Sequence, residues 1–325
     1  MMLKKLFILV LVIIAVLLLF GFMKKIKQKQ PTPISTPPSA TIGFGDYDFS
    51  LQYDGSVRKY LVHIPKSYDK NKTTPLILAF HGGMGTAEIM AENYDLIPKS
   101  DKEGFIVAFP NGASKFPSGK FATWNAGNCC GYAIKSDSDD VGFVKAIIED
   151  IKKKVNIGKI FATGMSNGGM LSYRLACEMS DTFAAIAAVS GTDNYNGCNP
   201  KQPISIMHIH GLKDDHVLFY GGCGPACVVG PETEFVSVPD TISRWVNRNN
   251  CNVNPQRVVV NENTYYDLYS KCDGDVQVKL YVVEDGGHSW PGAKKAPNPL
   301  EKSASSQAIS ATDEIWNFFK NSLSK

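Results

Sequence analysis

Several common patterns are missing from this 325-residue sequence. None of its eight cysteines forms a C-x-x-C pair, which excludes the usual paired-cysteine zinc sites. No segment repeats, which excludes a repeat architecture. Acidic residues are absent from residues 1–40, where six of the 34 basic residues lie, so 28 basic and 31 acidic residues remain beyond them. A domain so close to neutral gives no electrostatic case for a nucleic-acid partner.

The first forty residues concern the destination of the chain rather than its fold. Leu6 to Met23 is an uninterrupted apolar run, close to the minimum for a membrane span and longer than a signal-peptide core of roughly 7–15 residues. No small-x-small cleavage motif precedes the lysines that follow it, which favours an uncleaved anchor. We therefore predict an N-terminal membrane anchor or signal segment at 1–27 and a Pro-rich linker at 28–41.

All eight cysteines lie in the remaining domain, 42–325, which suits an oxidising compartment. The protein is thus expected outside the cytoplasm, either membrane-anchored or secreted. Cys223 with Cys227 would close a small loop, and Cys251 with Cys272 would staple the loop after a predicted helix. The other four are Cys129, Cys130, Cys177 and Cys198. A bond between the neighbours Cys129 and Cys130 would be strained, so these two are expected to have separate partners.

The domain at 42–325 is predicted to have an α/β fold. Asp54-Gly55, between the β-favouring runs 47–53 and 57–64, predicts a hairpin. Further strands are predicted at 75–80, 105–109, 159–163, 184–190, 203–210 and 276–283, and helices at 87–98, 140–153, 168–179, 238–249 and 312–323. This alternation favours a mostly parallel, doubly wound sheet flanked by helices. No large insertion suggests a separate lid domain.

The most informative stretch is Gly164-Met165-Ser166-Asn167-Gly168. It lies between a predicted strand and a predicted helix that opens on small residues. A sharp turn from strand to helix needs glycines on both sides of the serine, because a Cβ there would collide with neighbouring backbone. The pattern therefore predicts a nucleophile elbow with Ser166 exposed near the positive end of the helix.

An acid and a histidine follow in the chain order Ser, Asp, His that α/β-hydrolases use. Asp214 and Asp215 come after one predicted strand, and His288 comes after a later one. Side chains just beyond the carboxyl ends of such strands meet at one edge of the sheet. We expect Ser166 to attack a carbonyl, His288 to take and return the proton, and the aspartate to orient the histidine.

Glycines after an early apolar strand would complete this mechanism. The run His81-Gly82-Gly83-Met84 follows strand 75–80. Backbone N–H groups of Gly83 and Met84 are predicted to face the oxyanion together with that of Asn167.

The predicted substrate-binding residues are His81, Gly82, Trp124 and Trp290. The two tryptophans flank the site in sequence and are candidates for lining an acyl pocket. Large aromatic side chains are equally often part of the core.

Two other interpretations of these residues stay open. A metal hydrolase would use His208, His210, Asp214 and His216. The first two lie on one face of a predicted strand, where a buried or supporting histidine pair is the better account. A non-catalytic domain could instead bind cell-wall carbohydrate through Trp124 and Trp290, although the complete set of Ser, Asp and His argues against it. We expect no cofactor and no metal.

The combined motifs resemble the polyhydroxybutyrate depolymerase and feruloyl esterase family, the LpqC-like secreted esterases of the α/β-hydrolases. The resemblance spans about 47–319. It depends on YLVHIP at 60–65, FHGG at 80–83, WNAGNCCGY at 124–132, DDVGF at 139–143, GMSNGGM at 164–170, HIHG at 208–211 and GGHSWPG at 286–292.

The resemblance implies a serine esterase acting through an acyl-enzyme. Ser166 would be the nucleophile and His288 the base, and the acid four residues after His210 would be Asp214 rather than Asp215. The family usually has a single aspartate here, whereas this chain has Asp214-Asp215-His216. Feruloyl or acetyl esters of polysaccharide and short polyhydroxyalkanoate esters are the implied substrates, and acyl transfer to an alcohol through the same triad is the alternative.

Overall fold

The computed structural model of the protein describes residues 42–227, 233–294 and 305–323. The predicted N-terminal segment at 1–27 and the linker up to residue 41 lie outside these ranges. Within them, no helix is both long and apolar enough to cross a membrane.

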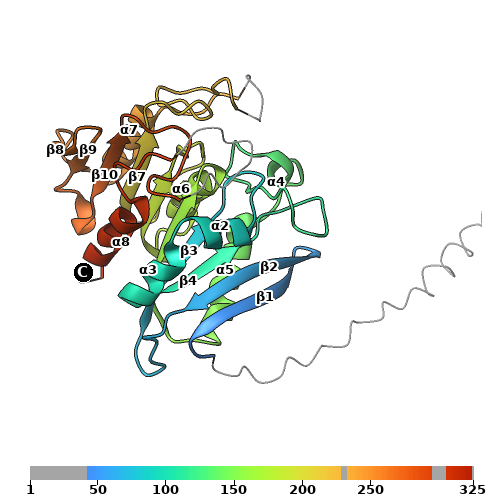
Figure 1. Ribbon diagram of the computed structural model, residues 1–325. Coiled ribbons are helices and arrows are strands. Elements are labelled where there is room, and N and C mark those ends of the chain that lie inside the picture. Colours follow the sequence, from blue (N-terminus) through green and yellow to red (C-terminus); the bar gives the residue numbers. More distant parts are fainter. Residues whose placement is uncertain (1–41, 228–232, 295–304, 324–325) are drawn as a thin grey trace, which may run out of the picture. The chain divides into compact units, whose positions relative to one another are not determined.

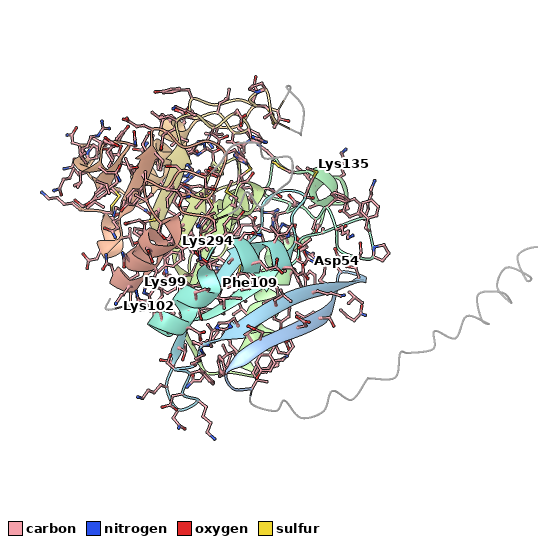
Figure 2. All side chains as sticks on the ribbon, in the orientation of Figure 1. Asp54, Lys99, Lys102, Phe109, Lys135 and Lys294 are labelled. Carbon is pink, nitrogen blue, oxygen red and sulfur yellow. A yellow bond between two sulfur atoms is a disulfide. The ribbon has the colours of Figure 1, made fainter. Side chains whose placement is uncertain are left out.

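Ten strands in the described ranges form one sheet, in the order β1-β2-β4-β3-β5-β6-β7-β10-β9-β8. They are β1 (Gly45–Tyr53), β2 (Ser56–Ile64), β3 (Thr74–Phe80), β4 (Ile106–Pro110), β5 (Ile157–Met165), β6 (Phe183–Val189), β7 (Ser205–Gly211), β8 (Gln256–Asn261), β9 (Thr264–Tyr269) and β10 (Val278–Val283). The run from β4 to β10 is parallel, and the strands on either side of it are antiparallel. Asp54 lies at the tip of the predicted β1–β2 hairpin (Figure 2).

Helices cover both faces of this sheet (Figure 1). One face packs against α5 (Asp140–Lys152), α6 (Asn167–Glu178) and α7 (Val238–Arg248). The other packs against α2 (Ala87–Asn93), α3 (Leu96–Glu103) and α8 (Ala311–Asn321). The short helix α4 (Gly131–Lys135) lies in the long segment between β4 and α5. The predicted fold class, a mostly parallel sheet flanked by helices, is confirmed.

The short helix α4 was not predicted, and two further elements differ from the prediction. The helix predicted at 87–98 is divided into α2 and α3 at Asp95, whose φ is 51°. Pro98 explains the division, because a proline lacks the N–H that a continuous helix needs but fits the first turn of a new one. The β8–β9 hairpin is absent from the prediction. The three valines at 258–260 follow one another without the alternation of a half-buried strand, and most residues of β8 are exposed.

The four disulfides join all eight cysteines. Cys223–Cys227 and Cys251–Cys272 are as predicted. The expectation of separate partners for Cys129 and Cys130 is wrong, since these neighbours are bonded to each other. Their side chains belong to a small buried cluster that packs beside the loop closed by Cys223–Cys227. The fourth disulfide joins Cys177 to Cys198.

Asp140 connects the long loop after β4 to the sheet. The N-cap of α5 is Asp139, whose side chain accepts from Gly142 N. Asp140 is fully buried, and its two oxygens accept from Arg58 and from the N–H of Asn125, each at 2.7 Å.

Asp140→Ala is expected to lower the free energy of unfolding by about 3–5 kcal/mol, because it leaves Arg58 as a buried, unpaired cation. Urea denaturation of the oxidised protein measures this change. Asp139→Ala is the matched control. It removes the N-cap and an exposed hydrogen bond from the Tyr53 hydroxyl and should cost only about 1–2 kcal/mol. Equal losses in the two variants would contradict the assignment of Asp140 as the connection to Arg58.

Candidate active site

Ser166 occupies a strained turn between β5 and α6. Its φ is 53° and its ψ is −121°, a conformation that residues with a side chain rarely adopt. A Cβ on Gly164 would lie 2.4 Å from the carbonyl carbon of Gly168, and a Cβ on Gly168 would lie 2.3 Å from the oxygen of Phe80. Both positions therefore require glycine, and Ser166 has the strand–turn–helix setting that the sequence predicts.

Ser166, His288 and Asp214 form one hydrogen-bonded row. The Ser166 hydroxyl lies 2.9 Å from His288 Nε2, and His288 Nδ1 lies 2.8 Å from Asp214 Oδ2. Asp214 follows β7 and His288 follows β10, and these neighbouring parallel strands bring residues 74 positions apart together. Asp215 turns instead toward His216, at 2.8 Å. Asp214 is thus the partner of His288, and the catalytic roles of the three residues remain predictions.

Asp214 is buried and surrounded by donors. Its Oδ1 accepts from the N–H groups of His216 and Val217, both at 2.9 Å. Its Oδ2 lies 3.2 Å from His210 Nε2 in addition to its contact with His288. Burial alone would raise the pKa of Asp214, but His288 and the hydrogen bonds from His210 and His288 outweigh it and hold that pKa well below its usual range. Asp214 therefore stays ionised at neutral pH.

The pair His208 and His210 supports Asp214 from behind. The Tyr173 hydroxyl donates to His208 Nδ1 at 2.8 Å, and His208 Nε2 donates to His210 Nδ1 at 3.0 Å. His210 Nε2 donates to the Val217 carbonyl at 2.8 Å. Burial and the neighbouring His210 lower the pKa of His208, so its ring is neutral. Because every ring nitrogen of the pair is already in a hydrogen bond, the donor set does not fit a metal site.

The glycine loop after β3 lies beside Ser166. Gly82, Gly83, Met84 and Asn167, all predicted here, line the same pocket. The Asn167 side chain exchanges hydrogen bonds with the backbone of Trp124, at 2.7 and 3.0 Å. The backbone N–H of Asn167 is among the first of α6, and the first N–H groups of a helix have no partner within the helix. Backbone donors for an oxyanion are thus available next to the serine.

His81 is buried below this loop and does not line the pocket. Its Nδ1 donates to the Gly82 carbonyl at 2.7 Å, and its Nε2 accepts from Gly112 N at 3.0 Å. Burial lowers the pKa of His81 to about 4, so the ring is neutral and can accept as well as donate. The sequence predicted that His81 binds substrate, whereas its position allows it to support the glycine loop.

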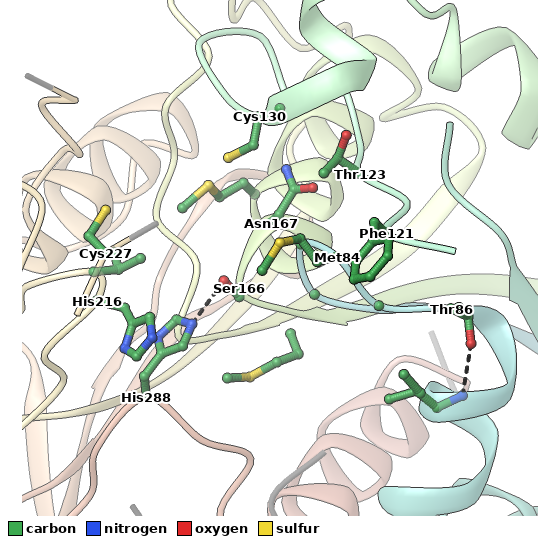
Figure 3. Close-up of a pocket in the computed structure, with 18 of the residues that line it drawn as sticks. Met84, Thr86, Phe121, Thr123, Cys130, Ser166, Asn167, His216, Cys227 and His288 are labelled. Carbon is green, nitrogen blue, oxygen red and sulfur yellow. Dashed lines mark hydrogen bonds between the residues drawn. The ribbon is translucent and has the colours of Figure 1, made fainter. Parts of the chain in front are cut away.

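The pocket around Ser166 has a volume of about 610 Å³. His216 and His288 lie on one side of Ser166, and Met84 and Phe121 lie on the other (Figure 3). Its wall is mostly apolar and includes Ile89, Met165, Met170, Val217 and Phe235. None of these residues was predicted to line the pocket, and His216 was named only as a metal ligand in the alternative interpretation. A signal existed for Met165, which precedes Ser166 directly, and for Met170, which lies one helical turn after it.

The predicted role of Trp124 and Trp290 in the acyl pocket is not supported, since neither lines it. Both side chains are fully buried. Trp124 Nε1 donates to the His81 carbonyl at 2.9 Å, and Trp290 Nε1 donates to Thr312 Oγ1 at 3.0 Å. The two indoles therefore pack in the cores on the two faces of the sheet, where each N–H finds an internal partner.

Comparison with known proteins places the chain in a family. The sequence model of the family described as Esterase PHB depolymerase matches residues 59–219. Probable feruloyl esterase C of Aspergillus oryzae is 31% identical over 274 residues, which cover 81% of this chain and 83% of the relative. Feruloyl esterase B of Piromyces equi is 31% identical over 71% of this chain and 42% of its own length. A bifunctional acetylxylan esterase/xylanase of Neocallimastix patriciarum is 27% identical over 72% of this chain and 31% of its own. The chain thus spans less than half of the last two relatives.

Solved structures share the fold at lower identity. The acetyl xylan esterase from Aspergillus awamori superposes with a TM-score of 0.56 at 14% identity, over 85% of this chain and 99% of that one. A ferulic acid esterase from Anaeromyces mucronatus superposes with a TM-score of 0.51 at 19% identity, over 89% and 94% of the two chains. The chain therefore belongs to the Esterase PHB depolymerase family and has an α/β-hydrolase fold. This conclusion follows from the family match, from the sequence identity to the Aspergillus oryzae relative and from the sheet described above.

Proposed function

We propose that the protein is a serine esterase that hydrolyses carboxylic esters through an acyl-enzyme. The observation that carries this proposal is the row Ser166–His288–Asp214, which opens onto an apolar pocket beside a glycine loop. Nucleophile, base and orienting acid are within hydrogen-bond distance in the order that nucleophilic catalysis needs.

The proposed chemistry has two halves. Ser166 Oγ attacks the ester carbonyl while its proton moves to His288 Nε2, and backbone N–H groups near Gly83 and Asn167 stabilise the oxyanion. The ester C–O bond then breaks, and His288 returns the proton to the departing alcohol. Water repeats the sequence on the acyl-enzyme and releases the acid, so His288 acts once as base and once as acid in each half.

The acyl group is proposed to be aromatic, as in a feruloyl ester of polysaccharide. The departing alcohol must lie beside His288, so the acyl group extends toward Met84 and Phe121 on the other side of Ser166. Sulfur and aromatic side chains contact an aromatic ring favourably. The names of relatives, feruloyl esterase and acetylxylan esterase, agree with an ester on polysaccharide.

Other candidate functions have less support. A short hydroxyalkanoate ester would fill little of a pocket of about 610 Å³. A carbohydrate-binding module would depend on Trp124 and Trp290, which are buried. Acyl transfer to an alcohol would use the same three residues, Ser166, His288 and Asp214. Its product is a new ester, whereas hydrolysis releases a free acid, so the product distinguishes the two reactions.

We also propose that the domain works outside the cytoplasm. Support comes from the four disulfides, which form and persist in oxidising compartments. Attachment to a membrane through residues 1–27 is part of the same proposal and depends on the apolar run in the sequence alone.

Methyl esters of ferulic, acetic and 3-hydroxybutyric acids test the proposal, because they share one alcohol and differ only in the acyl group. We expect the oxidised protein to release free acid from all three. The kcat/KM for methyl ferulate should exceed that for each of the other two esters by about 10-fold or more, because a few added apolar contacts contribute that much. Ser166→Ala is the inactive control. A folded, disulfide-bonded sample that hydrolyses none of them would contradict the esterase, and a preference for 3-hydroxybutyrate would contradict the aromatic acyl group.

A further inference from the structure

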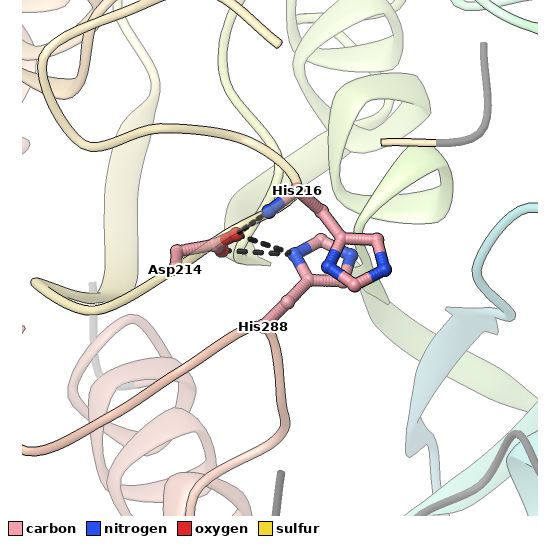
Figure 4. A group of neighbouring side chains, drawn as sticks. All are labelled: Asp214, His216 and His288. Carbon is pink, nitrogen blue, oxygen red and sulfur yellow. Dashed lines mark hydrogen bonds and ion pairs between the residues drawn. The ribbon is translucent and has the colours of Figure 1, made fainter. Parts of the chain in front are cut away.

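His216 lies flat against the ring of His288. The two ring centroids are 4.5 Å apart, and the ring planes differ by only 16° (Figure 4). The edges of the His288 ring are occupied by Asp214 and Ser166, and His216 covers one of its faces. His216 also lines the pocket, so it separates part of the His288 ring from the substrate space.

Three contacts hold His216 in this place. Its ring Nδ1 bonds to Asp215 Oδ1 at 2.8 Å, and its N–H donates to Asp214 Oδ1 at 2.9 Å. Its carbonyl accepts from Gly224 N at 2.9 Å, inside the loop that the Cys223–Cys227 disulfide closes. A Cβ on Gly224 would lie 2.1 Å from the Asp215 carbonyl oxygen, so this loop packs tightly against the segment that carries the histidine.

Stability does not explain the pair of His216 and Asp215. The Asp215 side chain is 50% exposed and that of His216 is 20% exposed. Exposed ion pairs contribute only about 0–1 kcal/mol. Orientation is the better account, because the hydrogen bond to Asp215 fixes the plane of the ring that is stacked on His288.

The chemistry gives that orientation a use. While the Ser166 proton is on His288 Nε2, the serine oxygen is bonded to the acyl carbon and no longer accepts a proton from the ring. The Asp214 carboxylate still holds the Nδ1 edge of the ring, while the opposite edge must turn its proton from the serine to the departing alcohol. A ring stacked on its face limits rotation at this moment, so that the proton stays directed at the departing alcohol.

A metal site is the competing explanation for the same residues. Ligand atoms of Asp214, His216 and His288 lie within 4.8 Å of one another, the one such group among the residues that the structure describes. An imidazole nitrogen binds a metal in the plane of its ring, and the two planes here are nearly parallel and stacked. Their lone pairs do not converge on one point, so the geometry favours stacking over coordination.

We infer that His216 is a positioning residue for His288, holding the plane of its ring while the proton passes from Ser166 to the departing alcohol. This inference rests on the proposed function. It assigns the Asp214-Asp215-His216 sequence two separate tasks: Asp214 binds the edge of the His288 ring, and Asp215 fixes the ring that covers its face.

Two substitutions at His216 test the inference with the best methyl ester and with p-nitrophenyl acetate. His216→Ala removes the stacked ring and is expected to lower kcat about 10-fold with KM changed less than about 3-fold, since misplaced catalytic groups cost rate rather than binding. His216→Phe restores a flat ring without nitrogen atoms and is expected to recover most of kcat. Asp215→Ala should lie between His216→Ala and the unchanged protein.

Tyr220→Ala is the matched control, because Tyr220 belongs to the same segment, is 80% exposed and lies outside the pocket lining. It should leave kcat unchanged. A folded His216→Ala with unchanged kcat would overturn the inference, as would a His216→Phe no faster than His216→Ala. Loss of activity of the unchanged protein on chelation would also overturn it in favour of a metal. An unchanged protein without activity on any ester would instead contradict the proposed function.

Discussion

Ser166→Ala and His288→Ala are each expected to lower kcat by about 10⁵- to 10⁶-fold, and the double variant should be hardly slower than either single one. The reason is that nucleophile and base act as a unit, so removing one makes the other useless. In the structure, the Ser166 hydroxyl has His288 Nε2 as its partner at 2.9 Å. The measurement is kcat for the best methyl ester, with purified variants whose disulfides are intact.

Ser172→Ala controls for the loss of a serine near the same turn. Ser172 lies on α6, and its hydroxyl donates to the Gly168 carbonyl at 3.0 Å, away from the pocket lining. Its kcat should stay within a few-fold of the unchanged protein. Losses that multiply in the Ser166→Ala, His288→Ala double variant would show that the two residues act independently and would contradict the proposed mechanism.

Asp214→Asn is expected to lower kcat by about 10⁴-fold, because the wrong tautomer of His288 cannot accept the serine proton. Its oxygens accept from two backbone N–H groups and from two histidines. Asparagine has an NH₂ group in place of one carboxylate oxygen. Because that group can only donate, at least one of these hydrogen bonds would have to reverse its direction or be lost. Asp215→Asn keeps an oxygen for His216 and should cost only a few-fold. The opposite ranking would transfer the role of the acid to Asp215.

The low pKa of Asp214 also bears on pH dependence. Its pKa in the folded protein lies below the unfolded value of about 4. The stability that this carboxylate contributes is therefore fully present above about pH 4 and is lost only as the pH falls toward the folded pKa. A fall in activity between pH 8 and pH 5 must come from another group.

Local chemistry explains which features were predictable from the sequence. The turn at Ser166 requires glycine at Gly164 and Gly168 because backbone atoms approach each other there, and such a requirement is visible in five consecutive residues. The choice of Asp214 over Asp215 came from a resemblance in spacing, and the structure gives its physical basis: Oδ1 of Asp214 accepts from the backbone two and three residues later.

Features that depend on distant segments were not predictable. The stack of His216 on His288 exists because the loops after β7 and β10 cross beside each other, which no local pattern encodes. Trp124 and Trp290 were misplaced for the same reason, since neighbours in three dimensions decide whether a large aromatic side chain lines a pocket or fills the core. The β8–β9 hairpin was not predicted because the three consecutive valines of β8 do not alternate with polar residues, which is the pattern that marks a half-buried strand.

The buried hydrogen bonds that end at Asp214 have a single direction. Burial raises the pKa of Tyr173 well above its usual value, so its hydroxyl always keeps its proton and always donates. His208 must then accept a hydrogen bond at Nδ1 and donate one from Nε2, and His210 must do the same. One phenol on α6 thereby selects one of two possible tautomers in each of two rings. The proton on His210 Nε2, which faces the carboxylate, is thus fixed from both ends, by a phenol that always donates and by the Val217 carbonyl, which can only accept.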